Sequence, residues 1–214
     1  MTIASIREGK LSGVLPLVAL LLVGFAGQVL AQPSQASAPK KVPQKKASDL
    51  IHKQEPPKVK GNLLDRATAS NVTVYVSLGK QRAYFKVDDE IAIDTPISSG
   101  KRAGMTPSGS FKIVEKDRDH RSSLYGNFVN SSGQVVRSGV SSKIDSAPSG
   151  TRYQGASMKW FMRFGDSSGG RAEGMHTGIL PGYPASHGCV RLPDEIAKLF
   201  FEHISVGTPV TIGE

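Results

Sequence analysis

The residues best suited to chemistry lie close together near the end of the chain. Residues 174–193 contain His176, His187, Arg191 and the only cysteine, Cys189. The thiolate is the nucleophilic form of cysteine, and an ordinary thiol is mostly protonated at neutral pH, so a reactive cysteine needs a base or a cation beside it. This combination predicts nucleophilic catalysis through Cys189.

Either histidine of this segment is a candidate for the base. His187 stands two residues before Cys189 and would point to the same side of an extended chain. His176 can reach the thiol from a neighbouring strand or loop, with the backbone around Thr177 orienting its ring. Gly188 lets the chain bend before the cysteine, which would turn the backbone N–H groups of Gly188 and Cys189 toward a developing oxyanion.

The same residue types allow other interpretations. Arg191 would either hold a substrate carboxylate in a bidentate manner or clamp the loop. His176, His187 and Cys189 are also candidate zinc ligands, although a closed structural zinc site requires a fourth ligand that this stretch does not supply. A further alternative is that Cys189 is a buried structural thiol.

The elements that must position these residues are mainly β-strands. Alternating apolar and polar residues or apolar runs predict strands at 72–78, 82–87, 90–97, 111–114, 158–164 and 208–212. One short helix is predicted over 193–203, because Pro193 suits a first helical turn and Asp194 and Glu195 favour its positive end. The fold class predicted from these patterns is therefore mainly β with one short helix.

Residues 117–157 are polar and rich in glycine and serine, with little periodicity. A segment of this length exceeds an ordinary connection, so we interpret it as a lid or a substrate-lining insertion and assign it no secondary structure.

The N-terminal part of the chain predicts export. Two basic residues precede an apolar run at 14–25, and Ala31 suits a cleavage site, so we interpret residues 1–31 as a signal peptide. An uncleaved membrane anchor is the alternative, and would be the protein's only contact with a membrane. Residues 32–69 are rich in proline and lysine and predict a disordered linker. We expect the folded domain to span residues 70–214.

The charge distribution argues against nucleic acid as a partner. The formal net charge is +9, but residues 1–60 hold nine Lys or Arg against three acids, whereas residues 61–214 hold eighteen against fifteen. A nucleic-acid-binding domain usually concentrates basic residues on its folded surface. Here the excess lies in the tail.

Three segments resemble one known family. Residues 186–192, which read SHGCVRL, resemble the signature of the L,D-transpeptidase catalytic domain, also called the YkuD domain. Residues 176–178 resemble its upstream histidine segment, although the order His-Thr-Gly differs from the commoner His-Gly-Thr. Residues 106–109 resemble its Thr-Pro-x-Gly loop, and the resemblance extends over roughly residues 71–213.

The resemblance implies a β-sandwich or barrel-like domain and a cysteine acyltransferase that acts on peptidoglycan. The cysteine would attack the diaminopimelate carbonyl of a stem tetrapeptide, release D-alanine and pass the acyl group to an amine, either for cross-linking or to attach a wall protein. It implies no metal or cofactor, and it implies a location in the periplasm or cell wall. A hydrolase or carboxypeptidase of the same fold and a non-catalytic wall-binding module are the alternatives.

The family roles carry over by position. Cys189 becomes the nucleophile, His176 the general base and His187 a supporting residue. Gly188 and Cys189 supply backbone N–H groups to the oxyanion. Arg191, Ser186 and Thr177 are expected to contact substrate.

Overall fold

The computed structural model describes residues 54–214. The predicted signal peptide 1–31 and residues 32–53 of the predicted linker lie outside the described residues. Within the described range the elements are β1 (Lys58–Val59), α1 (Gly61–Leu64), β2 (Val72–Ser77), β3 (Arg82–Val87), β4 (Glu90–Pro96), β5 (Gly109–Asp117), β6 (Arg121–Val129), β7 (Val135–Ser141), β8 (Arg152–Ser157), β9 (Phe161–Asp166), β10 (Gly169–Thr177), β11 (Val190–Leu192), α2 (Asp194–His203) and β12 (Pro209–Gly213).

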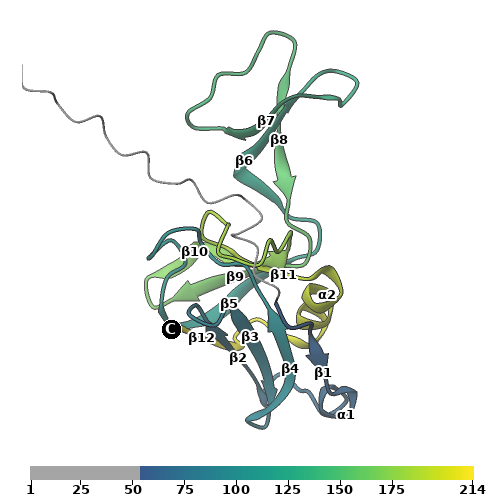
Figure 1. Cartoon of the computed structure of the whole chain (residues 1–214), viewed down its shortest axis with the longest axis vertical. Coiled ribbons are helices and arrows are strands. Elements are labelled where there is room, and N and C mark those ends of the chain that lie inside the picture. Colours follow the sequence, from purple (N-terminus) through teal and green to yellow (C-terminus); the bar gives the residue numbers. More distant parts are fainter. Residues whose placement is uncertain (1–53) are drawn as a thin grey trace, which may run out of the picture. The chain divides into compact units, whose positions relative to one another are not determined.

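Nine of the strands in residues 54–214 form one curled sheet, in the order β1-β4-β3-β2-β12-β5-β9-β10-β11 (Figure 1). Most neighbours are antiparallel, but β12 pairs with β2 and β10 pairs with β11 in parallel. The strands predicted at 72–78, 82–87 and 90–97 are confirmed as β2, β3 and β4, which pair antiparallel in sequence order. The apolar residues of the alternation in β2, Val72, Val74 and Val76, are all buried. The mainly β fold class is therefore confirmed.

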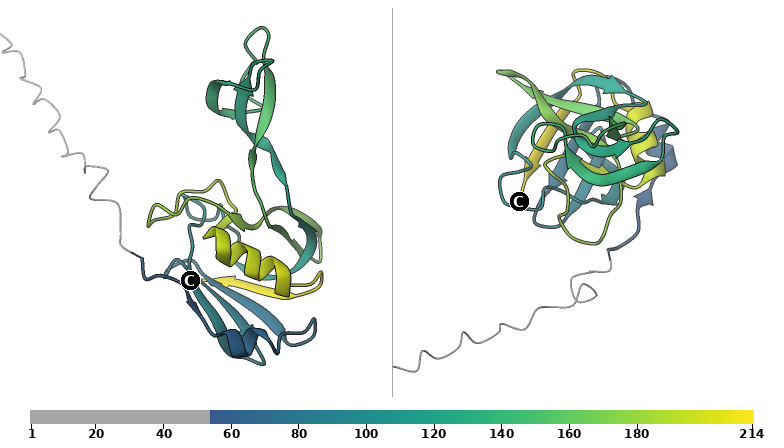
Figure 2. Two further views of the ribbon diagram at one scale, coloured as in Figure 1. Left: turned by 90° about the vertical axis from the view of Figure 1, so that its right-hand side faces the viewer. Right: turned by 90° about the horizontal axis from the view of Figure 1, so that it is seen from above.

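The helix α2 packs its apolar face on this sheet (Figure 2). It begins at Asp194, one residue after the predicted start, and Pro193 is its N-cap. Ile196 and Phe200 are buried, and the Phe200 ring lies 5.3 Å from the ring of Phe85 on β3. Strand β11 begins directly after Cys189, and α2 follows it with only Pro193 between them. The packing of α2 therefore also fixes the C-terminal end of β11.

Residues 117–157, which we left without predicted structure, are largely a second sheet. Strands β6, β7 and β8 pair in the order β7-β6-β8 and project beyond the nine-stranded sheet as an arm, defined here as residues 121–157 (Figure 1). Gly126 and Gly155 face each other across β6 and β8, where a side chain at either position would overlap the backbone of the opposite strand. Most of β7 is exposed, so the arm lacks the alternation that a half-buried sheet requires.

The folded domain also begins earlier than the predicted boundary at residue 70. Strand β1 pairs with β4, and the Lys60 N–H donates to the Ala92 carbonyl at 2.8 Å. Leu63 and Leu64 of the short helix α1 are buried, so this part of the predicted linker contributes to the core and adds a second helix. None of the helices in residues 54–214 is long and apolar enough to cross a membrane.

Candidate active site

The cysteine and one histidine meet where β10 and β11 run in parallel. His176 on β10 is paired with Arg191 on β11, and Cys189 directly precedes β11. Residues two apart in an extended chain point to the same face, and so do paired residues of neighbouring strands. The parallel pairing therefore places His176 and Arg191 on one face, and Cys189, two residues before Arg191, follows them by alternation, although nine residues separate His176 from the SHGCVRL segment.

A buried hydrogen-bond network fixes the turn before the cysteine. The Ser186 hydroxyl donates to the Cys189 carbonyl at 2.6 Å and accepts from the Gly188 N–H at 3.0 Å. The Thr106 hydroxyl donates to the Gly188 carbonyl at 2.6 Å, which ties the turn to the Thr-Pro-x-Gly loop. Ser186 is 2% exposed, so it holds the turn and does not make the substrate contact that we predicted.

Gly188 is required at its position for two reasons. Its φ is +139°, and a Cβ there would lie 3.0 Å from the Met105 carbonyl oxygen and 3.1 Å from Glu173 Cγ. Its N–H donates to Ser186, so the prediction that Gly188 donates to the oxyanion is not supported. Neither the backbone nor the side-chain hydrogen bonds among residues 54–214 use the Cys189 N–H, which leaves that donor available.

The Cys189 thiol is protonated in the resting protein. Burial raises its pKa above the ordinary value, and the negative charge of Glu173 acts in the same direction. The backbone of Gly174 and the positive charges of Arg191 and Arg163 oppose this shift without reversing it. The thiol must therefore lose its proton as it attacks.

The imidazole of His176 is neutral and oriented. It is 7% exposed, and its Nδ1–H donates to the Thr177 carbonyl at 2.6 Å, which leaves Nε2 as the acceptor and confirms that the backbone at Thr177 orients the ring. Burial lowers the pKa of His176 to about 4; the Thr177 hydrogen bond opposes this, and Arg191 and His120 add to it. Among the described residues no hydrogen bond joins His176 to Cys189, and contacts of this kind often tighten only with substrate.

His187 faces a different environment from His176. Its exposed ring stacks on Tyr125 of β6, with ring centroids 4.1 Å apart, and its Nε2 accepts from Lys101 Nζ at 3.2 Å. Partial burial lowers the pKa of His187, and the cations Lys101, Arg191 and Arg102 lower it further. His187 is therefore a neutral ring that links the arm to the turn at residues 186–189, called here the cysteine loop.

Arg191 acts as a clamp in this structure. Its guanidinium donates to the Ile179 carbonyl at 3.4 Å, and its aliphatic stem packs against Gly178. The side chain is only half-buried, so part of the guanidinium still faces the solvent beside Cys189. Arg191 can therefore hold the loop and still present positive charge to a substrate carboxylate, so both predicted roles of Arg191 are retained.

The zinc-ligand candidates do not converge. His187 is directed to Lys101 and Tyr125, whereas His176 is turned to Thr177. Across residues 54–214 no three His, Cys, Asp or Glu side chains are grouped in a way that could hold a metal ion.

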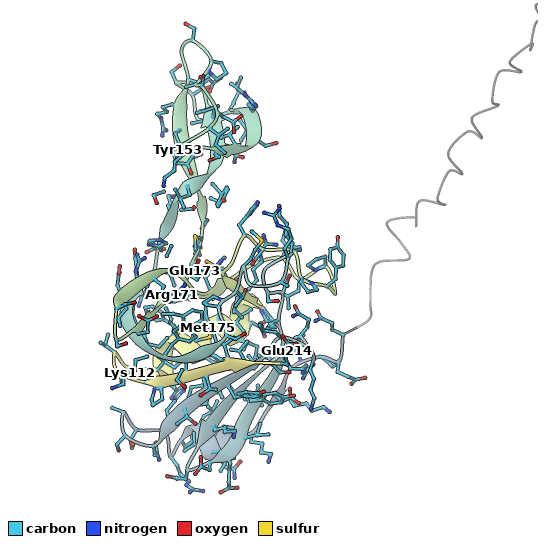
Figure 3. The ribbon with its side chains drawn as sticks, turned by 90° about the vertical axis from the view of Figure 1, so that its left-hand side faces the viewer. Lys112, Tyr153, Arg171, Glu173, Met175 and Glu214 are labelled. Atoms are coloured by element: carbon cyan, nitrogen blue, oxygen red, sulfur yellow. The ribbon has the colours of Figure 1, made fainter. Side chains whose placement is uncertain are left out.

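Sequence reasoning missed three residues that flank the site. Phe161 of β9 lies under the site, with its ring centroid 6.4 Å from that of His176. His120 stacks on Phe161 at 4.2 Å, and the Arg163 guanidinium lies 5.2 Å from the centre of the same ring. His120 lies at the edge of the segment left unassigned, so only its residue type marked it as a candidate. Figure 3 shows Arg171, Glu173 and Met175 along β10, the strand that carries His176, with Tyr153 in the arm.

Residues 71–212 match the model of the YkuD family, the L,D-transpeptidase catalytic domain. Similar solved structures include an L,D-transpeptidase from Mycobacterium smegmatis, at 20% identity and a TM-score of 0.47, covering 66% of this chain and 58% of that one. Another is an L,D-transpeptidase from Stackebrandtia nassauensis, at 21% identity and a TM-score of 0.46, covering 69% and 58%. The chain thus spans less than two thirds of the length of these proteins. No sequence among the curated proteins matches it.

Proposed function

The chain belongs to the L,D-transpeptidase catalytic domain family, and from this premise we propose that it is a peptidoglycan L,D-transpeptidase with Cys189 as its nucleophile. It forms a thioester with the diaminopimelate carbonyl of a stem tetrapeptide, releases D-alanine and transfers the acyl group to an amine. The observation that carries the proposal is the placement of the only thiol on one face with a buried, neutral imidazole, His176.

Acylation begins from two neutral partners. As the Cys189 sulfur bonds to the carbonyl carbon, its proton passes to Nε2 of His176. The free Cys189 N–H is the donor best placed to face the oxyanion. When the tetrahedral intermediate collapses, the bond to D-alanine breaks and the leaving amine takes the proton from the imidazolium. Because burial disfavours the charged ring, it gives up this proton readily.

Transfer reverses these roles. The acceptor nitrogen attacks the thioester carbon, His176 receives a proton from that nitrogen, and the proton then passes to the departing sulfur. Lys101, Arg102 and Arg191 lie around the cysteine loop, and this positive charge suits a stem peptide that carries carboxylates. The acceptor is an amine of a second stem or a lysine of a wall-attached protein; water as acceptor makes the enzyme a hydrolase.

Export is part of this proposal, because peptidoglycan lies outside the cytoplasmic membrane. The basic residues and apolar run of residues 1–31 support transport to the periplasm or cell wall.

Product analysis tests the proposal. The purified protein and its Cys189→Ala variant would each be incubated with a disaccharide-tetrapeptide, and the products separated by chromatography and weighed by mass spectrometry. The proposal predicts cross-linked dimers that have lost one D-alanine, and none with Cys189→Ala. Monomers shortened by one residue, without dimers, would assign a hydrolase. Binding to peptidoglycan without any product would indicate a wall-binding module.

A further inference from the structure

A second imidazole stands beside the site. His120 lies in the turn between β5 and β6, and its ring stacks on Phe161 with centroids 4.2 Å apart and planes 13° from parallel. The same Phe161 ring lies 6.4 Å from the ring of His176. The charge of His120 also reaches His176 and lowers its pKa. None of the steps described above uses His120.

A carboxylate orients this second imidazole. His120 Nδ1 lies 3.0 Å from Asp117 Oδ2, while the other Asp117 oxygen accepts the Asp119 N–H at 3.1 Å. With a proton on Nδ1 donated to Asp117, Nε2 of His120 keeps its lone pair. The His120 side chain is 22% exposed, so a proton taken by this ring can pass to solvent. A base oriented by a carboxylate is the arrangement found in general-base catalysis.

The transfer step requires such a second base. An aliphatic amine has a pKa of about 10 and is an ammonium ion at neutral pH. Ammonium plus thioester gives amide, thiol and one proton, so the nitrogen loses two protons in all. One must leave before the nitrogen can attack, and the other passes through His176 to the sulfur. His176 holds only one proton at a time and is committed to the proton that passes to the sulfur, so the first proton must go to another group.

The charges around the two ends of the site differ. The charges that act on His187 are the cations Lys101, Arg102 and Arg191. The carboxylate of Glu173, which lies beside Gly188, is paired with Arg171 at 3.5 Å. At the His120 end the carboxylate of Asp117 faces the imidazole directly.

The other charged groups near His120 are largely engaged elsewhere. Arg163 is paired with Glu115 at 2.6 Å, Arg118 lies over the Trp160 ring at 5.4 Å, and Arg121 donates to the Gly155 carbonyl. The Asp117 carboxylate, whose partners here are His120 and the Asp119 N–H, is therefore the negative charge held directly beside the His120 ring.

We propose that the Asp117–His120 pair is the base for the acceptor: it binds a cationic aliphatic amine and removes the proton that must leave before attack. His120 Nε2 takes this proton and releases it to solvent, while His176 serves the thiol. This role rests on the proposed transpeptidase function and extends it to the chemistry of the acceptor.

The test separates acylation from transfer. His120→Gln and Asp117→Asn would be compared with wild type and with the matched control Asp119→Asn, whose side chain makes no contact that the proposal needs. Acylation is followed by intact mass with a tetrapeptide donor. Transfer is followed with an aliphatic diamine, which is protonated at neutral pH, and with hydroxylamine, which is not.

His120→Gln is expected to acylate at the wild-type rate and to transfer to the diamine about 100-fold more slowly, the scale of one general base. Transfer to hydroxylamine should be unchanged, and Asp119→Asn should match wild type with both acceptors. Asp117→Asn should show the same selective loss as His120→Gln, and covers the case in which one variant does not fold.

Equal losses with both acceptors, slower acylation, or no loss would overturn the role of His120 while leaving the transpeptidase intact. Absence of an acyl adduct in the wild-type protein would instead refute the proposed function, and this inference with it.

Discussion

Acidification should destabilise this protein through His176 by about 3 kcal/mol between pH 7 and pH 4. Burial lowers the pKa of His176 from 6.5 to about 4 in the folded state. Between pH 6.5 and pH 4 the unfolded chain therefore binds a proton at His176 that the folded protein does not bind. This contribution to the free energy of unfolding is fully present above about pH 6.5 and is lost as the pH falls toward 4. The gap between the two pKa values, at about 1.36 kcal/mol per pKa unit, sets its size.

Urea unfolding of wild type and His176→Gln at several values between pH 7 and pH 4 measures this term. Glutamine can donate to the Thr177 carbonyl but does not titrate, so the difference between the two proteins isolates the imidazole. Between pH 7 and pH 4 the free energy of unfolding should fall by roughly 2 to 3 kcal/mol more in wild type than in His176→Gln. Thr177→Ala keeps the backbone carbonyl and should follow wild type. Parallel curves for wild type and His176→Gln would show that His176 titrates normally, and would refute the argument from burial.

Three further substitutions test the turn and the arm. Gly188→Ala places a Cβ 3.0 Å from the Met105 carbonyl oxygen at a φ of +139°; it should slow acylation and lower the free energy of unfolding, and a wild-type rate of adduct formation would contradict this. Ser186→Ala leaves the buried Gly188 N–H without its acceptor and should cost about 1–3 kcal/mol in chemical denaturation. Tyr125→Ala removes the stack on His187, and hydrogen exchange should become faster in β6 to β8; unchanged exchange would show that the stack does not restrain the arm.

Six strands of the nine-stranded sheet were predictable because apolar residues of each face the core. The alternation of Val72, Val74 and Val76 follows directly from that burial, and α2 shows its capping charges in the sequence. The arm gave no such signal, since its strands are largely exposed on both faces. Leu63 and Leu64 lie among polar neighbours, so the local composition concealed their place in the core.

The site was predictable in its residue types but not in its charges. The SHGCVRL motif marked Cys189 from sequence, but the parallel pairing of β10 and β11 that brings His176 beside this segment was not predicted. Burial, which lowers the pKa of His176 and raises that of Cys189, depends on packing by residues far along the chain. The same is true of His120, which reaches the site only because the turn after β5 folds back on Phe161.

The most direct test of the account is to trap the acyl-enzyme. The protein would be mixed briefly with a tetrapeptide donor in the absence of acceptor, quenched in acid, and its mass and peptide map recorded. The account predicts a single adduct with the mass of the donor less D-alanine, carried by the peptide that contains Cys189 and absent from Cys189→Ala. An adduct on another residue, or release of D-alanine by Cys189→Ala, would contradict it.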